Sequence, residues 1–61
     1  MKTLCYYVER GTKIDATLLF VAELFDCTFA IRTAEMNYRE VTIYCNEEDV
    51  VGIQIAISPI L

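Results

Sequence analysis

Three cysteines are the side chains with the widest chemical range in this sequence of 61 residues, because the chain contains no histidine. Cys5, Cys27 and Cys45 are widely spaced and form no C-x-x-C pair. A structural zinc ion usually takes four Cys or His ligands, so these thiols could complete such a site only with a second chain. An odd number of cysteines also argues against a secreted disulfide framework. We expect reduced thiols in the core of a cytoplasmic protein, and no metal site.

Other catalytic chemistries lack the residues that they need. A nucleophilic cysteine or serine requires a neighbouring base, and the usual base, histidine, is missing. Gly11 and Gly52 stand alone, which excludes a Gly-rich phosphate loop. Paired carboxylates could act as acid and base, but they need a cleft that a domain of this size rarely encloses. The sequence predicts a protein that is not an enzyme, with no catalytic residue and no cofactor.

The net charge of the chain indicates which classes of macromolecule it could bind. Nine acidic residues face five basic ones, which gives a net charge of -4. Nucleic-acid binding draws on clustered Lys and Arg, so we expect no direct nucleic-acid partner. The acidic run Glu47, Glu48 and Asp49 permits two hypotheses. It could imitate nucleic acid on a basic protein, or it could be the solvated start of a helix, where acids complement the helix dipole.

Length allows one small domain, residues 1–61, and 56% of these residues are apolar. Such a domain hides only about 60% of the surface of its extended chain, so its stability is marginal. The longest uncharged stretch, 50–61, is shorter than the about 20 residues that a membrane span needs. The first residues do not form the apolar region of a signal peptide. We expect a cytoplasmic protein that does not bind membranes.

Alternation of apolar and polar residues in 3–9 predicts a first strand, with Leu4, Tyr6 and Val8 on one face and the odd-numbered residues on the other. After the break at residues 10–12, Thr12 and Asp15 have the spacing of a capping box, which predicts the start of a helix.

Residues 14–26 have the periodicity of a helix. A stripe that should face the sheet consists of Ile14, Leu18, Val21, Ala22 and Phe25. Phe20 and Leu24 lie one turn apart on a separate flank, so either a second helix or another molecule should cover them.

Residues 28–34 and 38–45 alternate again, and the intervening residues 35–37 predict a hairpin. Apolar positions of the two strands should lie in phase: Phe29, Ile31 and Thr33 with Val41, Ile43 and Cys45.

The last segment leaves two alternatives. Asn46 followed by three acids is typical of a helix start, and a helix over 47–57 would bring together Val50, Ile53, Ile57, Ile60 and Leu61 until Pro59 stops it. Strict alternation from Val51 to Ile57 also suits a strand. The capping pattern favours the helix.

These elements predict an α+β fold, a two-layer β-α-β-β-α sandwich with both helices on one face of a three-stranded sheet in spatial order 2-3-1. The central strand would carry Val41, Ile43 and Cys45. If the last segment is a strand, the alternative is β-α-β-β-β, in which one helix covers four strands.

The chain supplies more apolar residues than a core of this size covers, and exposed apolar patches mark interaction sites. We therefore expect a homodimer or a tight protein partner. The residues that we assign to protein binding are on the open sheet face, on the helix flank and in the acidic run: Tyr7, Arg32, Tyr38 and Tyr44; Phe20 and Leu24; Glu47, Glu48 and Asp49. The edge strand 28–34, with Arg32 as its one charge, could pair with a further strand.

The functional expectation is a non-enzymatic protein-binding module, a small acidic inhibitor or accessory factor of the kind that viruses also use, which docks to a larger protein. Two alternatives remain open. The chain could be a structural subunit that only forms homo-oligomers, or a small-molecule sensor with its ligand at a dimer interface.

Overall fold

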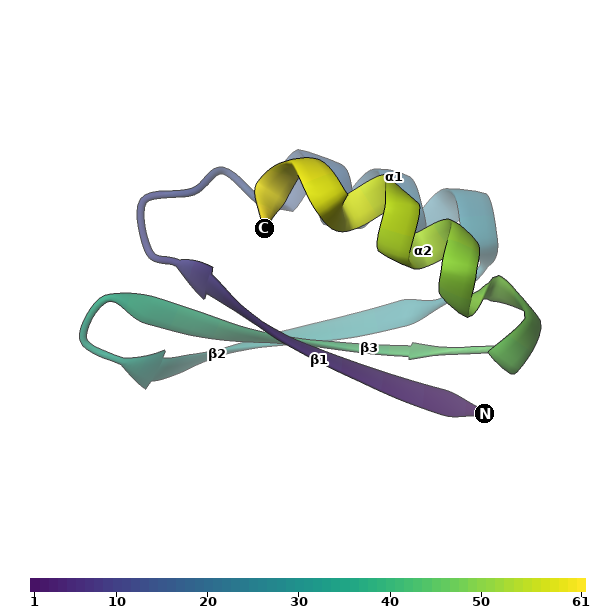
Figure 1. Cartoon of the computed structure of the whole chain (residues 1–61), viewed down its shortest axis with the longest axis horizontal. Helices are drawn as coiled ribbons and strands as arrows, with labels where there is room; N and C mark the ends of the chain where they lie inside the picture. The colour runs from purple at the N-terminus through teal and green to yellow at the C-terminus, as the bar shows by residue number, and fades with distance from the viewer.

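A three-stranded antiparallel sheet carries two helices on one face in the computed structural model, which describes all residues 1–61 (Figure 1). The elements follow in the order β1 (Lys2–Glu9), α1 (Asp15–Phe25), β2 (Thr28–Glu35), β3 (Tyr38–Cys45), a 3-10 turn (Glu47–Asp49), α2 (Val50–Ile57) and a second 3-10 turn (Ser58–Ile60). The predicted α+β fold of order β-α-β-β-α is therefore confirmed, and the four-stranded alternative is wrong.

The sheet has β3 at its centre, hydrogen-bonded to β1 on one side and to β2 on the other. Both pairs are antiparallel, and Ile43 lies opposite Leu4 in β1 and Phe29 in β2. This pairing confirms the predicted order 2-3-1. Helix α1 connects the two edge strands, β1 and β2, across the sheet. Edge strand β2 is exposed at every residue except Phe29.

The hairpin between β2 and β3 is tighter than expected. Glu35 belongs to β2 and pairs with Tyr38, so the turn contains two residues and not three. The register shifts between Thr33 and Glu35, which leaves Ala34 without a partner as a bulge. No residue in the turn has a positive φ, so this is not the Asn-Gly type of hairpin turn.

Nine side chains form the core between the sheet and the helices, and all are apolar: Val8, Ile14, Leu18, Val21, Val41, Ile43, Cys45, Ile53 and Ile57. They come from the predicted faces of β1, α1, β3 and α2, with Leu4 and Tyr6 packed at the margin. The expectation of core thiols holds for Cys45 but is wrong for Cys5, which is exposed because odd positions of β1 face away from the helices.

Helix α1 begins without the predicted capping box. Ile14 is the N-cap, and no side chain caps the helix. Ile14 is 1% exposed, so burial of its side chain fixes where the helix starts. Thr12 is held elsewhere: its N–H donates to the Glu9 carbonyl over 3.0 Å, and its own carbonyl accepts from Arg39 Nη2 over 2.7 Å.

The last segment is helical, as the capping pattern predicted. Asn46 is the N-cap of the first turn, although it acts through its carbonyl, which accepts from the Asp49 N–H over 3.0 Å, and not through its side chain. Ile53 and Ile57 are buried in the core. Leu61, which was expected on the same stripe, is 59% exposed because the chain turns into a 3-10 conformation at Pro59.

The two helices lie side by side over the sheet, and the end of α1 meets the beginning of α2 (Figure 1). Gly52 makes this approach possible. A Cβ atom at that position would lie 2.7 Å from Cε1 of Phe25, closer than side chains tolerate. The absence of a side chain at Gly52 therefore lets the Phe25 ring pack directly on the backbone of α2.

Because α2 is a helix, alanine substitution of two nearby isoleucines should lower the free energy of unfolding by unequal amounts. Ile53→Ala should lower the free energy of unfolding by about 2–5 kcal/mol, because it leaves a cavity in the core. Ile55→Ala should change it by less than about 0.5 kcal/mol, since Ile55 is 70% exposed. Chemical denaturation in dilute solution, where association does not contribute, measures both values. Equal costs would indicate a strand, in which both side chains share one face.

Candidate functional site

The sheet face opposite the helices is uncovered (Figure 1). It carries four residues that the sequence assigned to protein binding, Tyr7, Arg32, Tyr38 and Tyr44. The tyrosines are between 38% and 61% exposed. Their hydroxyl groups and ring surfaces are therefore available for contact with a partner.

A row of three side chains crosses the middle of this face. Arg32 on β2 and Tyr7 on β1 lie opposite Glu40 on β3. Arg32 Nη2 is 3.0 Å from Glu40 Oε1, and the Tyr7 hydroxyl donates to Glu40 Oε2 over 3.4 Å. Glu40 is only 15% exposed along its side chain, whereas Arg32 is 73% exposed. The row joins all three strands through one carboxylate.

Glu40 was not among the residues predicted to bind a partner. Its alternation phase did place it on the open face, but its role depends on the registers of two strand pairs, which the sequence does not specify residue by residue. The position of Glu40 on the central strand could have indicated this role, because an acid there needs a basic or hydroxyl partner on a neighbouring strand.

The tyrosines do not form a single cluster. Tyr44 pairs with Thr3 and Thr28 at the opposite end of β3 from Tyr38. The two lie six positions apart along the strand, a distance of about 20 Å. Tyr7 and Tyr38 are diagonal neighbours across β1 and β3, which brings their rings within reach of each other.

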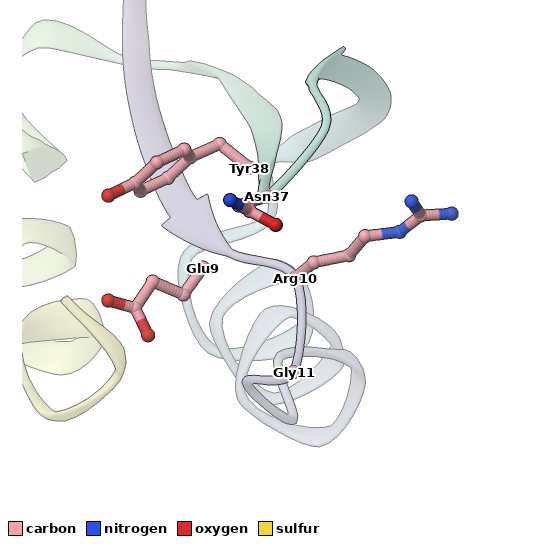
Figure 2. A pocket seen from close by; sticks show the side chains of 5 residues that line it. All are labelled: Glu9, Arg10, Gly11, Asn37 and Tyr38. Atoms are coloured by element: carbon pink, nitrogen blue, oxygen red, sulfur yellow. The ribbon is translucent and has the colours of Figure 1, made fainter.

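Three hollows surround Tyr38, and it lines all of them. One of about 370 Å³ lies between the end of β1 and the hairpin turn, with Glu9, Arg10 and Asn37. Figure 2 shows the Tyr38 ring and the Glu9 carboxylate projecting to one side of this hollow and Arg10 projecting to the other. The two remaining hollows, of about 390 and 250 Å³, are both also lined by Tyr7.

The second exposed surface lies on the helices. Its members are large apolar side chains that are between 58% and 70% exposed: Leu19, Phe20 and Leu24 of α1, with Val51 and Ile55 of α2. We call these five residues the helical surface. The second helix leaves Phe20 and Leu24 exposed, because α1 meets it through Phe25. Val51 and Ile55 were not assigned to binding, since their role depended on whether this segment was a helix or a strand.

The acidic run occupies the 3-10 turn that leads into α2. Glu47 and Glu48 are exposed, and Asp49 is half-buried. All three lie in the first turn of the helical segment, where negative charge is favourable. They lie beyond the end of β3 that is farther from Tyr38.

The cysteines do not come together, and all three thiols are unpaired. Burial raises the pKa of the Cys27 thiol, whose Sγ lies 3.7 Å from the Val21 carbonyl oxygen. No three Cys, Asp or Glu side chains converge closely enough to hold a metal ion. Neither α1 nor α2 has the length and apolar character of a membrane-crossing helix.

Comparisons with protein-family models, curated proteins and solved structures gave no significant match.

The contact between Tyr7 and Glu40 predicts a pH dependence. The negative charge of Glu40 raises the pKa of the Tyr7 phenol above its ordinary value of 10.0, because a phenolate there would be repelled. Since the pKa is higher in the folded than in the unfolded chain, the stability from this contact is present below pH 10.0 and is lost as the pH rises through the folded-state pKa.

Glu40→Gln should therefore lower the pKa of Tyr7, as measured by NMR titration of its ring carbons. Glu47→Gln, at an exposed acid on the far side of the molecule, is the control and should leave the pKa of Tyr7 unchanged. An identical Tyr7 titration in Glu40→Gln and the native chain would contradict the contact.

Proposed function

We propose that this chain is a non-enzymatic protein-binding module that works as a homodimer. Two copies associate through the helical surface, and the open sheet faces of the dimer dock to a larger protein, as an acidic inhibitor or accessory factor would. The observation that carries the proposal is the apolar, uncharged exterior of α2.

Helix α2 does not have the composition of a solvent-facing helix. Residues 50–57 include no charged side chain, and Gln54 is their only polar one. A helix that is apolar on all sides is normally buried. Here only one side is buried, because Ile53 and Ile57 point into the core while Val51 and Ile55 are 67% and 70% exposed. The exposed side is expected to be covered in the working protein.

A second copy of the chain is the occupant that the surface favours. Interfaces between permanently associated identical chains are more apolar than those of transient complexes and resemble a domain core cut in half. All five residues of the helical surface are uncharged and aliphatic or aromatic. A two-fold arrangement would place this surface against itself, so one patch supplies both sides of the interface.

Stability supports the same conclusion. The nine-residue core is small, and small domains with limited burial often depend on association for additional stability. Pairing of the helical layers would place four helices between two sheets and would convert exposed apolar surface into buried surface.

The open sheet face then points outward from each subunit and is free for another protein. Tyr and Arg are the residue types most often found at the energetic centres of protein interfaces. Tyr7 and Arg32 are both held in place by Glu40, so less conformational freedom is lost when a partner binds. The acidic character of the chain suits a partner with a basic surface.

Sedimentation equilibrium tests the dimer. The native chain should have the mass of two chains, and Phe20→Asp combined with Leu24→Asp should have the mass of one, because two charges would be buried without partners in the interface. Circular dichroism should report a folded chain in both, since the two native residues are about 60% exposed.

The matched control is Met36→Asp, at a residue that is 83% exposed in the hairpin turn and outside the helical surface. It should remain dimeric. A native chain that sediments as a single chain at high concentration would overturn the dimer. So would a Phe20→Asp, Leu24→Asp chain that still has the mass of two chains.

A further inference from the structure

The end of the sheet around Tyr38 combines aromatic rings, carboxylates and concave surface. Tyr7 and Tyr38 both line a hollow of about 390 Å³ and a second hollow of about 250 Å³. Glu9 lines the first hollow and Glu35 lines the second. Each hollow therefore combines the two tyrosines with one carboxylate.

Neither carboxylate is neutralised within the chain. Arg32 and Glu40 form the single ion pair of the structure, so Glu9 and Glu35 have no basic partner. Arg10 lies close in sequence, but Figure 2 shows that it projects away from Glu9 and Tyr38, and its Nη1 donates to the Met36 carbonyl over 3.3 Å.

Arg39 is a second arginine near this end. Its Nη2 donates to the Thr12 carbonyl over 2.7 Å, and it lines neither hollow. Both arginines thus donate to backbone carbonyl groups, whereas the carboxylates of Glu9 and Glu35 remain available for a positive charge from outside.

The larger hollow has an apolar wall in addition. Pro59, Ile60 and Leu61, from the last 3-10 turn and the residue after it, also line this hollow. The methylene stem of a long basic side chain packs favourably on such a wall while its charged head stays in polar surroundings. The carbonyl end of a helical segment also carries partial negative charge, which favours a cation.

We propose that this end of the sheet is a binding site for a cationic side chain, Arg or Lys, that the larger protein partner presents. The charged head lies against the Tyr7 and Tyr38 rings, where the negative π faces attract it, and a carboxylate of Glu9 or Glu35 completes the site. The proposal rests on the protein-binding function above and specifies the chemistry that the partner must offer.

Charge complementarity selects this occupant over others. A phosphate or a carboxylate would be repelled by Glu9 and Glu35, neither of which forms an ion pair within the chain. A purely apolar side chain would leave both carboxylates unpaired next to it. A cation on a flexible stem satisfies the rings, the carboxylates and the apolar wall together.

The test uses the tripeptide acetyl-Gly-Arg-Gly-amide and its Lys counterpart as probes, with the citrulline tripeptide as an uncharged analogue of nearly the same shape. At low ionic strength, the Arg and Lys probes should produce saturable NMR shifts of the Tyr7 and Tyr38 ring protons, and the citrulline probe should not. No saturable shift, or equal shifts with citrulline, would overturn the proposal.

Tyr38→Leu keeps an apolar side chain but removes the ring, and it should weaken binding of the Arg probe about two- to fivefold. The matched control is Tyr44→Leu, since Tyr44 is on the same strand and face and is 41% exposed against 38% for Tyr38. It should leave the affinity unchanged. Equal weakening by the two substitutions would contradict a site at Tyr38.

Glu9→Gln combined with Glu35→Gln keeps both rings and decides the question if Tyr38→Leu does not fold. It should weaken binding of the Arg probe and flatten its dependence on salt, because the carboxylates supply the charge attraction. Unchanged affinity in this variant would overturn the proposal. Probe binding needs neither the dimer nor the larger partner. The probe experiment can therefore refute the cation site without refuting the dimer, and the sedimentation experiment can refute the dimer without refuting the cation site.

Discussion

The packing of Ile53 and Ile57 against the sheet is the interaction on which the rest of the structure depends. Both side chains are at most 2% exposed, and they join the core residues of β3 and α1 in one cluster. This contact closes the core and fixes α2 beside α1. It also determines which side of α2 is exposed. Because the helical repeat is 3.6 residues, burial of Ile53 and Ile57 places Val51 and Ile55 on the exterior. The apolar helical surface is therefore a direct consequence of how the core is completed, and it is the feature that the dimer proposal explains.

The same burial determines the open face of the sheet. Because side chains alternate along a strand, placing Val41 and Ile43 under the helices sends Glu40 to the other side, where Tyr7 and Arg32 meet its carboxylate. A shift of one residue in register would bury these polar groups and expose the core. The open face is thus both ordered and polar, and all three hollows of the molecule are lined by Tyr38 at one end of the sheet. One layer of the molecule offers apolar contact to a second copy, and the other offers aromatic and acidic groups to a basic partner.

Much of this fold could be predicted from alternation and helical periodicity. The core stripe of α1 followed from helical spacing, and the strand order followed from the right-handed crossover between the edge strands. The exposure of Phe20 and Leu24 did not follow, because the second helix was one of the two covers expected for them, and α1 meets that helix through Phe25 instead. The start of α1 could not, because burial of Ile14 outweighs the local capping preference of Thr12. Nor could the bulge at Ala34, since the turn between β2 and β3 sets its own register. For the candidate site, the residue types were visible but their grouping was not. Tyr38 lies near Tyr7 because of strand pairing over long sequence distance, which one sequence does not encode in any local pattern.

Intermolecular NOE measurements on a mixture of isotope-labelled and unlabelled chains test the account most directly. If two copies associate through their helices, isotope-filtered spectra should contain cross-peaks between chains from the Phe20 ring and from the methyl groups of Leu24, Val51 and Ile55, and none from Met36 or Tyr44. Spectra without such cross-peaks at high protein concentration, or with cross-peaks only from residues of the sheet, would contradict the proposal that a second copy covers the exterior of α2.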